Sequence, residues 1–368
     1  MYTGPNIVKD GIIFYYDTGN SKSYKGEPTT NLILFNVTVA NFSNDYGSNL
    51  VSQTANYSIT YKGRPSLKIV STAQWNLYRA GRAGNFAETS SAVFTFSWKM
   101  KWSDGKVPVF GGYIYTDGYY YYPSVTVSAI DDGWYLCQTS ATGTSAPLWL
   151  TGFNSTQTGT CYVTDWQAEA KSHASEFITS NTTRSVTQGL LPLTTKTTLD
   201  LSNVSFDSNG TIIFDGTNDY FDINQNFGIL SQYTIEYVAY SNGGTKMPIS
   251  SRTTTNFYKY GDASWYYTHG GVGGEFYHGT SPAISGDIHY VIRYDGSNVK
   301  VWRNNNYAGA QASTGTADFS DGFKVGWWTG GGSYAWNGKI PIIKIYNKAL
   351  TTDEVSIYYN AIKTRFNI

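Results

Sequence analysis

Residues 93–102 have the sequence VFTFSWKMKW, in which large apolar side chains alternate with polar or small ones. A period of two is typical of a β-strand, because successive side chains point to opposite faces of a sheet. The core-facing set is predicted to be Phe94, Phe96, Trp98, Met100 and Trp102. This strand therefore packs one face on a core and leaves the other face polar.

Similar short segments, separated by Gly, Asn, Asp and Ser, occur on both sides of this strand. They include SLKIVST, GWYLCQTSAT and TCYVTDWQAEA, and then YTIEYVAY, IRYDGSNVKVWR and NGKIPIIKIYN. Such spacing predicts an all-β fold of two antiparallel β-sandwich domains, and Asp295 to Asn298 is predicted to be a hairpin turn. The polar stretch 182–200 is interpreted as a connection between the domains.

One helix is predicted, at the C-terminal end, in the segment LTTDEVSIYYNAIKTRF. Thr351 or Thr352 can cap it, because a hydroxyl oxygen accepts a hydrogen bond from an unpaired amide of the first turn. The apolar face is predicted to contain Val355, Ile357, Tyr358, Ala361 and Ile362.

Composition excludes several classes of protein. The 368 residues carry 26 basic and 26 acidic side chains, and this zero net charge argues against nucleic-acid binding, which needs a basic face. No run of about 18 apolar residues is present, so we expect no membrane insertion. The N-terminus lacks the pattern of a secretory signal peptide. Cys137 and Cys161 are expected to be buried, reduced thiols, with a cross-strand disulfide as the alternative.

The second series of strands resembles the laminin-G-like, concanavalin A-like lectin jelly roll of tailed-phage virion proteins. The resemblance rests on IIFDGTNDYFDI, on IHYVIRYDGSNVKVWRNNNYAG, and on NGKIPIIKIYNKALTTDEVSIYYNAIKTRF. The N-terminal GPNIVKDGIIFYYDTGNSKSY is similar to the opening of the same pattern, where it runs almost directly into the strand that IIFDGTNDYF represents here.

The long stretch between the N-terminal segment and IIFDGTNDYF is predicted to be an inserted domain. Residues 1–29 are predicted to pair with the C-terminal sandwich at 188–368, and residues 30–187 are predicted to be the insert. The insert resembles a carbohydrate-binding-module-like jelly roll of phage tail and fibre proteins, which often closes with an aromatic residue, a Gln-x-Glu and a Thr-Arg tail. The matching residues here are Trp166, Gln167, Glu169, Thr179 and Arg184.

Three glycine-flanked aromatic clusters are the candidate glycan-binding sites, because sugars stack on aromatic rings and hydrogen-bond to neighbouring polar groups. The clusters contain Tyr119, Tyr120, Tyr121 and Tyr122; Trp265, Tyr266 and Tyr267; and Trp327, Trp328 and Trp336. Neighbouring rings on a strand point to opposite sides, so some rings of each cluster cannot lie in the same core. Subunit packing and an ordinary core position are the alternatives at each cluster.

Metal binding and catalysis have weaker signals. Asp215, Asn218 and Asp219 crowd one turn and could hold calcium, as some laminin-G-like folds do, but turn chemistry explains DGTND equally well. No other cofactor is implied. Retaining glucanases of this fold carry Glu-x-Asp-x-x-Glu on one strand, and this string is absent. We therefore expect no enzymatic activity and no catalytic residue. The four histidines, His289 among them, are interpreted as surface or hairpin residues.

Together the resemblances imply a structural protein of a phage virion surface, made in the host cytoplasm, as a capsid decoration, head fibre, tail fibre or other appendage. It would bind non-covalently to glycans and to neighbouring virion proteins, as a homo-oligomer or as part of a larger assembly. The alternative is a polysaccharide depolymerase or glycoside hydrolase of the concanavalin A-like fold. The glycan, the location on the virion and the oligomeric state are left open at this point.

Overall fold

The computed structural model of the chain describes most of its length. The described residues are 8–31, 42–43, 50–71, 76–80, 93–110, 114–116, 119–121, 124–142, 153–155, 157–179, 182–195, 197–242, 246–252, 257–260, 264–269, 272–277, 287–314, 316–328 and 334–368. Side chains are described for 8–31, 58–70, 93–110, 124–140, 157–179, 182–195, 197–242, 247–252, 287–314, 316–328 and 334–368.

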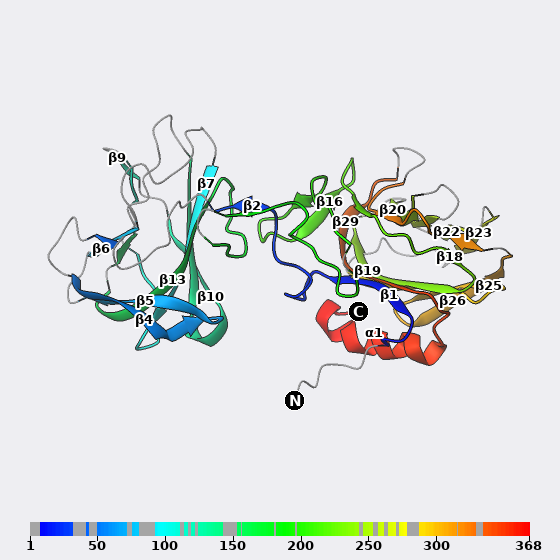
Figure 1. Cartoon of the computed structure of the whole chain (residues 1–368), viewed down its shortest axis with the longest axis horizontal. Helices are drawn as coiled ribbons and strands as arrows, with labels where there is room; N and C mark the ends of the chain where they lie inside the picture. The colour runs from blue at the N-terminus through cyan, green and yellow to red at the C-terminus, as the bar shows by residue number, and fades with distance from the viewer. Residues whose placement is uncertain are drawn as a thin grey trace. The chain divides into compact units, whose positions relative to one another are not determined.

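The chain forms two compact units, each built from antiparallel sheets (Figure 1). Unit 1 comprises Met1–Pro28, Ser185–Asp207 and Thr211–Ile368, and unit 2 comprises Thr29–Arg184 with Ser208–Gly210. One helix follows the last strand of unit 1. The predicted all-β class, with antiparallel sandwiches and a C-terminal helix, is confirmed.

The larger sheet of unit 1 has eight strands. They are β1 (Ile12–Asp17), β15 (Ser205–Phe206), β16 (Ile212–Asp215), β19 (Tyr233–Ser241), β24 (Asp287–Tyr294), β25 (Asn298–Arg303), β26 (Asn306–Ala312) and β29 (Asn337–Tyr346). The N-terminal strand β1 pairs with β29 near the other end of the chain, with Tyr15 opposite Lys344. On its other side β29 pairs with β19, with Glu236 opposite Lys344. The hairpin turn between β24 and β25 lies at Asp295 to Asn298, as predicted.

The smaller sheet of unit 1 has six strands. They are β17 (Phe221–Ile223), β20 (Lys246–Ser251), β21 (Phe257–Tyr260), β22 (Ser264–His269), β23 (Val272–Tyr277) and β28 (Phe323–Val325). The two-stranded sheet of β18 (Ile229–Leu230) and β27 (Ala317–Asp318) lies apart from it. Alternate residues of both main sheets, such as Ile235, Tyr237 and Ile343 from the larger and Phe221 and Phe323 from the smaller, form one buried cluster. This cluster is the core of the sandwich.

The stretch 182–200 contains the boundary between the two units, at Arg184 and Ser185, and from Ser185 onward it belongs to unit 1. Leu190 and Leu199 are fully buried in the core of unit 1. The backbone of Leu191 donates to Ser23 O and that of Leu193 donates to Tyr15 O, which attaches this stretch to the N-terminal segment. Apolar side chains at a wide spacing within a polar stretch do not produce a recognisable period, so the sequence pattern did not reveal their burial.

Helix α1 (Thr352–Phe366) packs on the outer face of the larger sheet (Figure 1). Thr351 is the N-cap and forms a capping box with Glu354, so of the two predicted candidates Thr351 has this role. Val355, Tyr358 and Ile362 are buried on the sheet. Ile357 is 44% exposed, so its predicted place on the buried face was wrong. No described helix is long and apolar enough to cross a membrane.

The main sheet of unit 2 has six strands, in the order β10 (Thr126–Ala129), β11 (Tyr135–Thr142), β7 (Val93–Trp102), β13 (Gly159–Glu169), β5 (Arg64–Ser71) and β4 (Leu50–Tyr61). Smaller sheets pair β3 (Phe42–Ser43), β6 (Asn76–Ala80) and β12 (Phe153–Ser155), then β2 (Thr29–Thr30) with β14 (Thr183–Arg184), and β8 (Ile114–Thr116) with β9 (Tyr119–Tyr121).

One face of β7 builds the core of unit 2, as predicted. Phe94, Phe96, Trp98, Met100 and Trp102 are all in the buried cluster of this unit. Cys137 and Cys161 belong to the same cluster and are free thiols, so the expectation of buried, unpaired cysteines is confirmed. Burial raises the pKa of both thiols well above the usual value, which keeps them protonated and unreactive.

Candidate functional site

The structure describes three of the ten predicted glycan-binding residues in full. Strand β9 consists of Tyr119, Tyr120 and Tyr121, and β22 contains Trp265, Tyr266 and Tyr267. The structure describes the backbone of these six residues but not their side chains, and Tyr122 lies outside the described residues. Trp327, Trp328 and Trp336 are described with their side chains.

These three tryptophans lie in different environments. Trp336 is 1% exposed and belongs to the core of unit 1, so it is not an exposed stacking platform. Trp328 is half-buried, and its ring centroid is 5.8 Å from that of Tyr334. Trp327 is also half-buried, and its ring lies 6.4 Å from the ring of Tyr220. Trp327 and Trp328 therefore each combine partial exposure with an aromatic neighbour, and the neighbour of Trp327 also contacts a charged residue, Lys324.

Charged residues lie next to the Tyr220 ring. The Lys324 ammonium lies 3.6 Å from the centroid of the Tyr220 ring and 3.0 Å from the Asp222 carboxylate. The Arg252 guanidinium is 3.8 Å from the same carboxylate and donates from Nη1 to Asn224 Oδ1 at 2.6 Å. We call the five residues Tyr220, Asp222, Arg252, Lys324 and Trp327 the Trp327 cluster.

Strand alternation places this cluster on the outer face of the smaller sheet of unit 1. Phe221 and Ile223 of β17 point into the core, so Asp222 points outward. In the facing strand β28, Lys324 is the Cα partner of Asp222 and likewise points outward. Gly326 follows with a positive φ of 86°, and the chain turns so that Trp327 O accepts from the Ser250 hydroxyl.

The chemistry of the Trp327 cluster suits a saccharide. The two rings supply apolar faces, and the Lys324 ammonium on the Tyr220 ring, with the Asp222 carboxylate and the Arg252 guanidinium beside it, supplies charged hydrogen-bond partners. The sequence pattern identified Trp327 but not Tyr220, Arg252 or Lys324. They come from three separate strands or strand ends, and only the pairing of β17, β28 and β20 brings them together.

The residues predicted to hold calcium form a tight turn in the structure. One oxygen of Asp215 accepts from the backbone amides of Thr217 and Asn218, and one oxygen of Asp219 accepts from those of Ser205 and Asp215. Backbone amides thus occupy these carboxylate oxygens, which is the alternative that turn chemistry offered. In the described part of the chain no three His, Cys, Asp or Glu side chains come together as a metal site.

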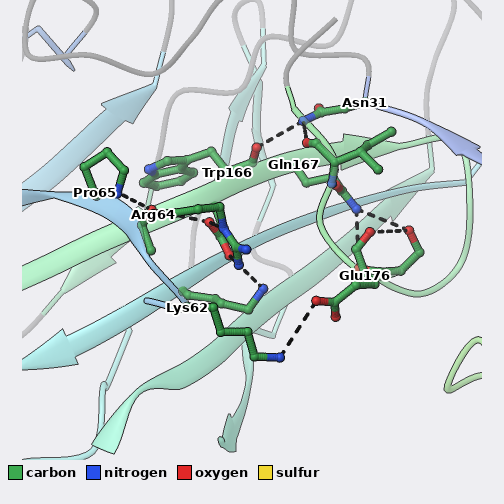
Figure 2. A network of polar contacts seen from close by, with 12 residues as sticks. Asn31, Lys62, Arg64, Pro65, Trp166, Gln167 and Glu176 are labelled. Carbon is green, nitrogen blue, oxygen red and sulfur yellow. Dashed lines mark hydrogen bonds and ion pairs between the residues drawn. The ribbon is translucent and has the colours of Figure 1, made fainter. Parts of the chain in front are cut away.

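Unit 2 contains a second polar cluster (Figure 2), which includes Lys99 of β7, and alternation places Lys99 on the face opposite Trp98 and Met100. Its centre is Asp165, whose side chain is 1% exposed. Both carboxylate oxygens accept from Arg64, with Nε at 2.6 Å from Oδ1 and Nη2 bonded to Oδ2, and Lys99 Nζ lies 3.1 Å from Oδ2. The bidentate hydrogen bond satisfies both carboxylate oxygens, and it raises the pKa of Arg64.

Two irregular backbone features place these groups. Strand β13 has a bulge between Thr164 and Gln167, and Asp165 adopts a positive φ of 54° within it. The bulge turns Asp165 to the polar face and Trp166 to the core, where Trp166 stacks on Trp98 at 5.4 Å. Arg64 begins β5 after a turn in which Lys62 and Gly63 have φ values of 47° and 78°. Such values are typical of a two-residue hairpin turn.

The residues that resemble the closing pattern of a carbohydrate-binding module hold the following segment against the sheet. Gln167 Oε1 accepts from the amide of Ile178 at 2.7 Å, and Glu169 accepts from Thr29 and from both the amide and hydroxyl of Ser175. Arg184 donates to the carbonyl of Glu176 at 2.7 Å. Gln167, Glu169 and Arg184 are buried and their polar groups are used within the protein, so their role here is structural, whereas Thr179 is exposed.

Unit 1 contains a buried cluster of three ionisable residues that the sequence did not predict. Glu236, His289 and Lys344 are each 0% exposed and lie on neighbouring strands beneath α1. The interpretation of His289 as a surface or hairpin residue was wrong, because the helix covers its face of the sheet. His289 Nε2 is 2.9 Å from Glu236 Oε1, and Lys344 Nζ is 3.9 Å from Glu236 Oε2.

Comparisons with known proteins show partial likenesses of fold. No protein-family model matches the chain, and no curated protein matches it. Among solved structures, a pentraxin from Limulus polyphemus is 18% identical, over 39% of this chain and 78% of that one, with a TM-score of 0.34. Domain 4 of the arabinanase AbnA from Geobacillus stearothermophilus is 13% identical, over 47% of this chain and 92% of that one, with a TM-score of 0.37.

The binding domain of botulinum neurotoxin serotype D is 11% identical, over 48% of this chain and 49% of that one, with a TM-score of 0.37. This chain therefore matches about half of the neurotoxin domain. Identities and TM-scores this low assign no activity and no ligand to the chain.

Proposed function

We propose that this chain is a non-enzymatic, glycan-binding protein of a phage virion surface, and that the Trp327 cluster is one of its glycan contacts. The observation that carries the glycan part is the pair of half-buried rings, Trp327 and Tyr220, on the outer face of a sheet. A pyranose can stack on such rings while Asp222 and Arg252 bond its hydroxyl groups.

The virion part of the proposal is supported by the residues that resemble phage lectin-like sandwiches, in particular IIFDGTNDYFDI and NGKIPIIKIYNKALTTDEVSIYY. A balanced charge suits such a role, since it leaves adhesion to depend on shape, stacking and hydrogen bonds. Fold likeness alone does not imply function, so the location needs its own experiment.

The absence of catalysis is also a proposal. The buried carboxylates of Asp165, Glu169 and Glu236 are each bound to cations or hydrogen-bond donors of the chain itself. A glycosidase needs two carboxyl groups about 5 to 10 Å apart that face a groove and a substrate. The competing function, polysaccharide depolymerisation, would release reducing ends from a bound polysaccharide.

A glycan array with three proteins tests the glycan contact. We expect the wild-type chain to bind a subset of glycans and Trp327→Ala to bind them at least about tenfold more weakly, which is about 1.4 kcal/mol. The matched control is Tyr307→Ala, because Tyr307 is an aromatic residue of unit 1 that is 55% exposed and lies on β26 of the larger sheet, with its ring 5.4 Å from that of Trp302. Equal binding by Trp327→Ala and the wild type would remove the Trp327 cluster from the proposal.

Imaging of intact particles tests the location. Density for both sandwich units on the capsid, collar or tail is the expected result, and particles without this chain would contradict the virion role. Reducing-sugar assays on every glycan that binds complete the test, since cleavage by the wild type would favour the depolymerase.

A further inference from the structure

Lys344 occupies an unusual position for a lysine. Its side chain is 0% exposed, and its Nζ has no hydrogen-bond partner in the described part of the chain. A buried ammonium without hydrogen bonds is strongly destabilising. Burial lowers the pKa of Lys344 to about 7, although the nearby Glu236 and Asp17 carboxylates act in the opposite direction. At neutral pH much of this residue is therefore a neutral amine, which has a free lone pair and is a nucleophile.

The carboxyl group of Glu236 is the neighbour of this amine. Glu236 and Lys344 are directly opposite each other on the paired strands β19 and β29, and Nζ lies 3.9 Å from Oε2. Glu236 is also 0% exposed, so no bulk water separates the two groups. Paired strands hold the two side chains together permanently, which gives a reaction between them a high effective concentration.

Other side chains complete the surroundings of this pair. His289 Nε2 lies 2.9 Å from Glu236 Oε1, and the Tyr346 hydroxyl lies 3.3 Å from Oε2 as a donor. The Tyr358 ring of α1 covers the amine, with its centroid 2.8 Å from Nζ, and Tyr15 of β1 lies on the other side at 5.0 Å. The site thus has a nucleophile, a carboxyl group, a proton carrier and a donor for a developing oxyanion, in a water-poor environment.

From this geometry we infer that Lys344 and Glu236 form an intramolecular amide bond, which joins β19 to β29 covalently. Transfer of one ammonium proton to the Glu236 carboxyl group frees the lone pair of Nζ, which adds to Cδ, and a C–N bond forms. Tyr346 stabilises the oxygen that remains. The C–Oε1 bond then breaks, and the oxygen leaves as water with the acid proton and one of the two amine protons, which His289 transfers. The products are one secondary amide and one water molecule, so no oxidant or co-reactant is needed.

The amide bond would remove the energetic cost of burying two ionisable groups at this site. A buried amine and a buried carboxyl group, one of them without a hydrogen-bond partner, are replaced by a neutral amide. The bond also closes a long loop of the chain across the central strands of unit 1, which would restrict the unfolded state in the manner of a disulfide. The inference does not depend on the proposed glycan binding or on the location of the protein.

Two other close pairs of lysine and carboxylate serve as comparisons. Lys99 lies 3.1 Å from Asp165, but both oxygens of that carboxylate already accept hydrogen bonds from Arg64, which holds it away from reaction with an amine. Lys348 lies 2.8 Å from Glu354, but 28% of the Lys348 side chain is exposed, and water keeps both groups charged. We expect no amide at either position.

Mass spectrometry of the whole purified chain under denaturing conditions tests this inference directly. The expected mass is that of the sequence minus one water molecule. A protease digest should contain one branched peptide in which the segment with Glu236 is joined to the segment with Lys344, and trypsin should not cut after Lys344. An intact mass equal to that of the sequence, both after purification and after days of incubation of the folded protein, would overturn the inference.

Variants distinguish formation of this amide bond from other reactions that release water, such as formation of a cyclic imide at Asp295–Gly296. Lys344→Met should have the full mass, whereas the matched variant Lys348→Met should still lack one water molecule. If Lys344→Met also lacks one water molecule, the water is lost at another site, and the proposed amide bond is refuted. If Lys344→Met does not fold, the branched peptide of the wild type decides the question by its presence or absence. His289→Asn should slow the loss of water in a time course, while the fold, followed by circular dichroism, is unchanged.

Discussion

Replacement of Asp165 by Asn tests the polar cluster of unit 2. Asn has almost the same shape and also tolerates a positive φ, so the bulge conformation of β13 is kept and only the charge is removed. Asp165→Asn leaves the Arg64 guanidinium and the Lys99 ammonium facing each other without their common anion. The substitution therefore measures the contribution of one buried carboxylate.

The expected loss of stability follows from burial. Removal of one partner of a buried ion pair costs about 3–5 kcal/mol. The Asp165 side chain is 1% exposed and that of Lys99 is 10% exposed, but Arg64 is 34% exposed and can regain some hydration. We therefore expect the low end of this range, about 3 kcal/mol, in the free energy of unfolding of unit 2.

The measurement is urea unfolding, monitored by hydrogen exchange and mass spectrometry of peptides from β7 and β13. These peptides report on unit 2 separately. Lys99→Met in the Asp165→Asn background removes the unpaired ammonium, so the double variant should be more stable than the sum of the single effects by about 1–2 kcal/mol. Asp104→Asn is the control, because its ion pair with Lys106 is exposed and its loss should cause no measurable change. A loss below about 1 kcal/mol for Asp165→Asn, or additive single effects, would refute the reasoning.

Three further predictions concern unit 1. Gly322 and Gly228 have similar φ values, 78° and 75°, but a Cβ atom at Gly322 would collide with the carbonyl oxygen of Ile223, whereas one at Gly228 would meet nothing. Calorimetry should show a loss of about 1 kcal/mol for Gly228→Ala and at least about 3 kcal/mol for Gly322→Ala, and equal losses would contradict the steric explanation. Thr351→Ala removes the cap of α1 and should cost about 1 kcal/mol and increase amide exchange in its first turn, and an unchanged exchange rate would argue against the cap. Burial raises the pKa of Asp295, but the Lys300 ammonium and the backbone amides outweigh it and lower this pKa below its unfolded value. Asp295 therefore stabilises the fold above about pH 4, and this contribution is lost as the pH falls further. In acid titrations of stability, Asp295→Asn should differ from the wild type at pH 7 and approach it below pH 4, and a difference independent of pH would contradict this linkage.

Alternation and local turn chemistry made much of the fold predictable. The burial of Phe94, Phe96 and Trp98 follows directly from a period of two, because a strand has only two faces. The cap at Thr351 and the turn at Asp295 also depend on residues within a few positions of each other. For such features the sequence contains both interacting partners in one short segment.

The candidate sites were less predictable, as the tryptophans show. Trp327 and Trp336 come from the same aromatic cluster of the sequence, yet Trp336 is in the core and Trp327 is half-buried beside Tyr220. Periodicity assigns a residue to a face of its strand, but it does not say which face another layer will cover. Tyr220 and Lys324 reach Trp327 only through strand pairing.

The sequence by itself determined that this chain is all-β, which side of each clearly alternating strand is apolar, and where the C-terminal helix begins. Only the tertiary structure decided that Glu236, His289 and Lys344 meet, since they come from β19, β24 and β29 and lie on a face that would be solvated without α1. The physical reason is that alternation is a property of neighbouring residues, whereas burial of a polar group depends on what distant segments place over it. A polar position on a strand is therefore read as exposed until a covering element is known.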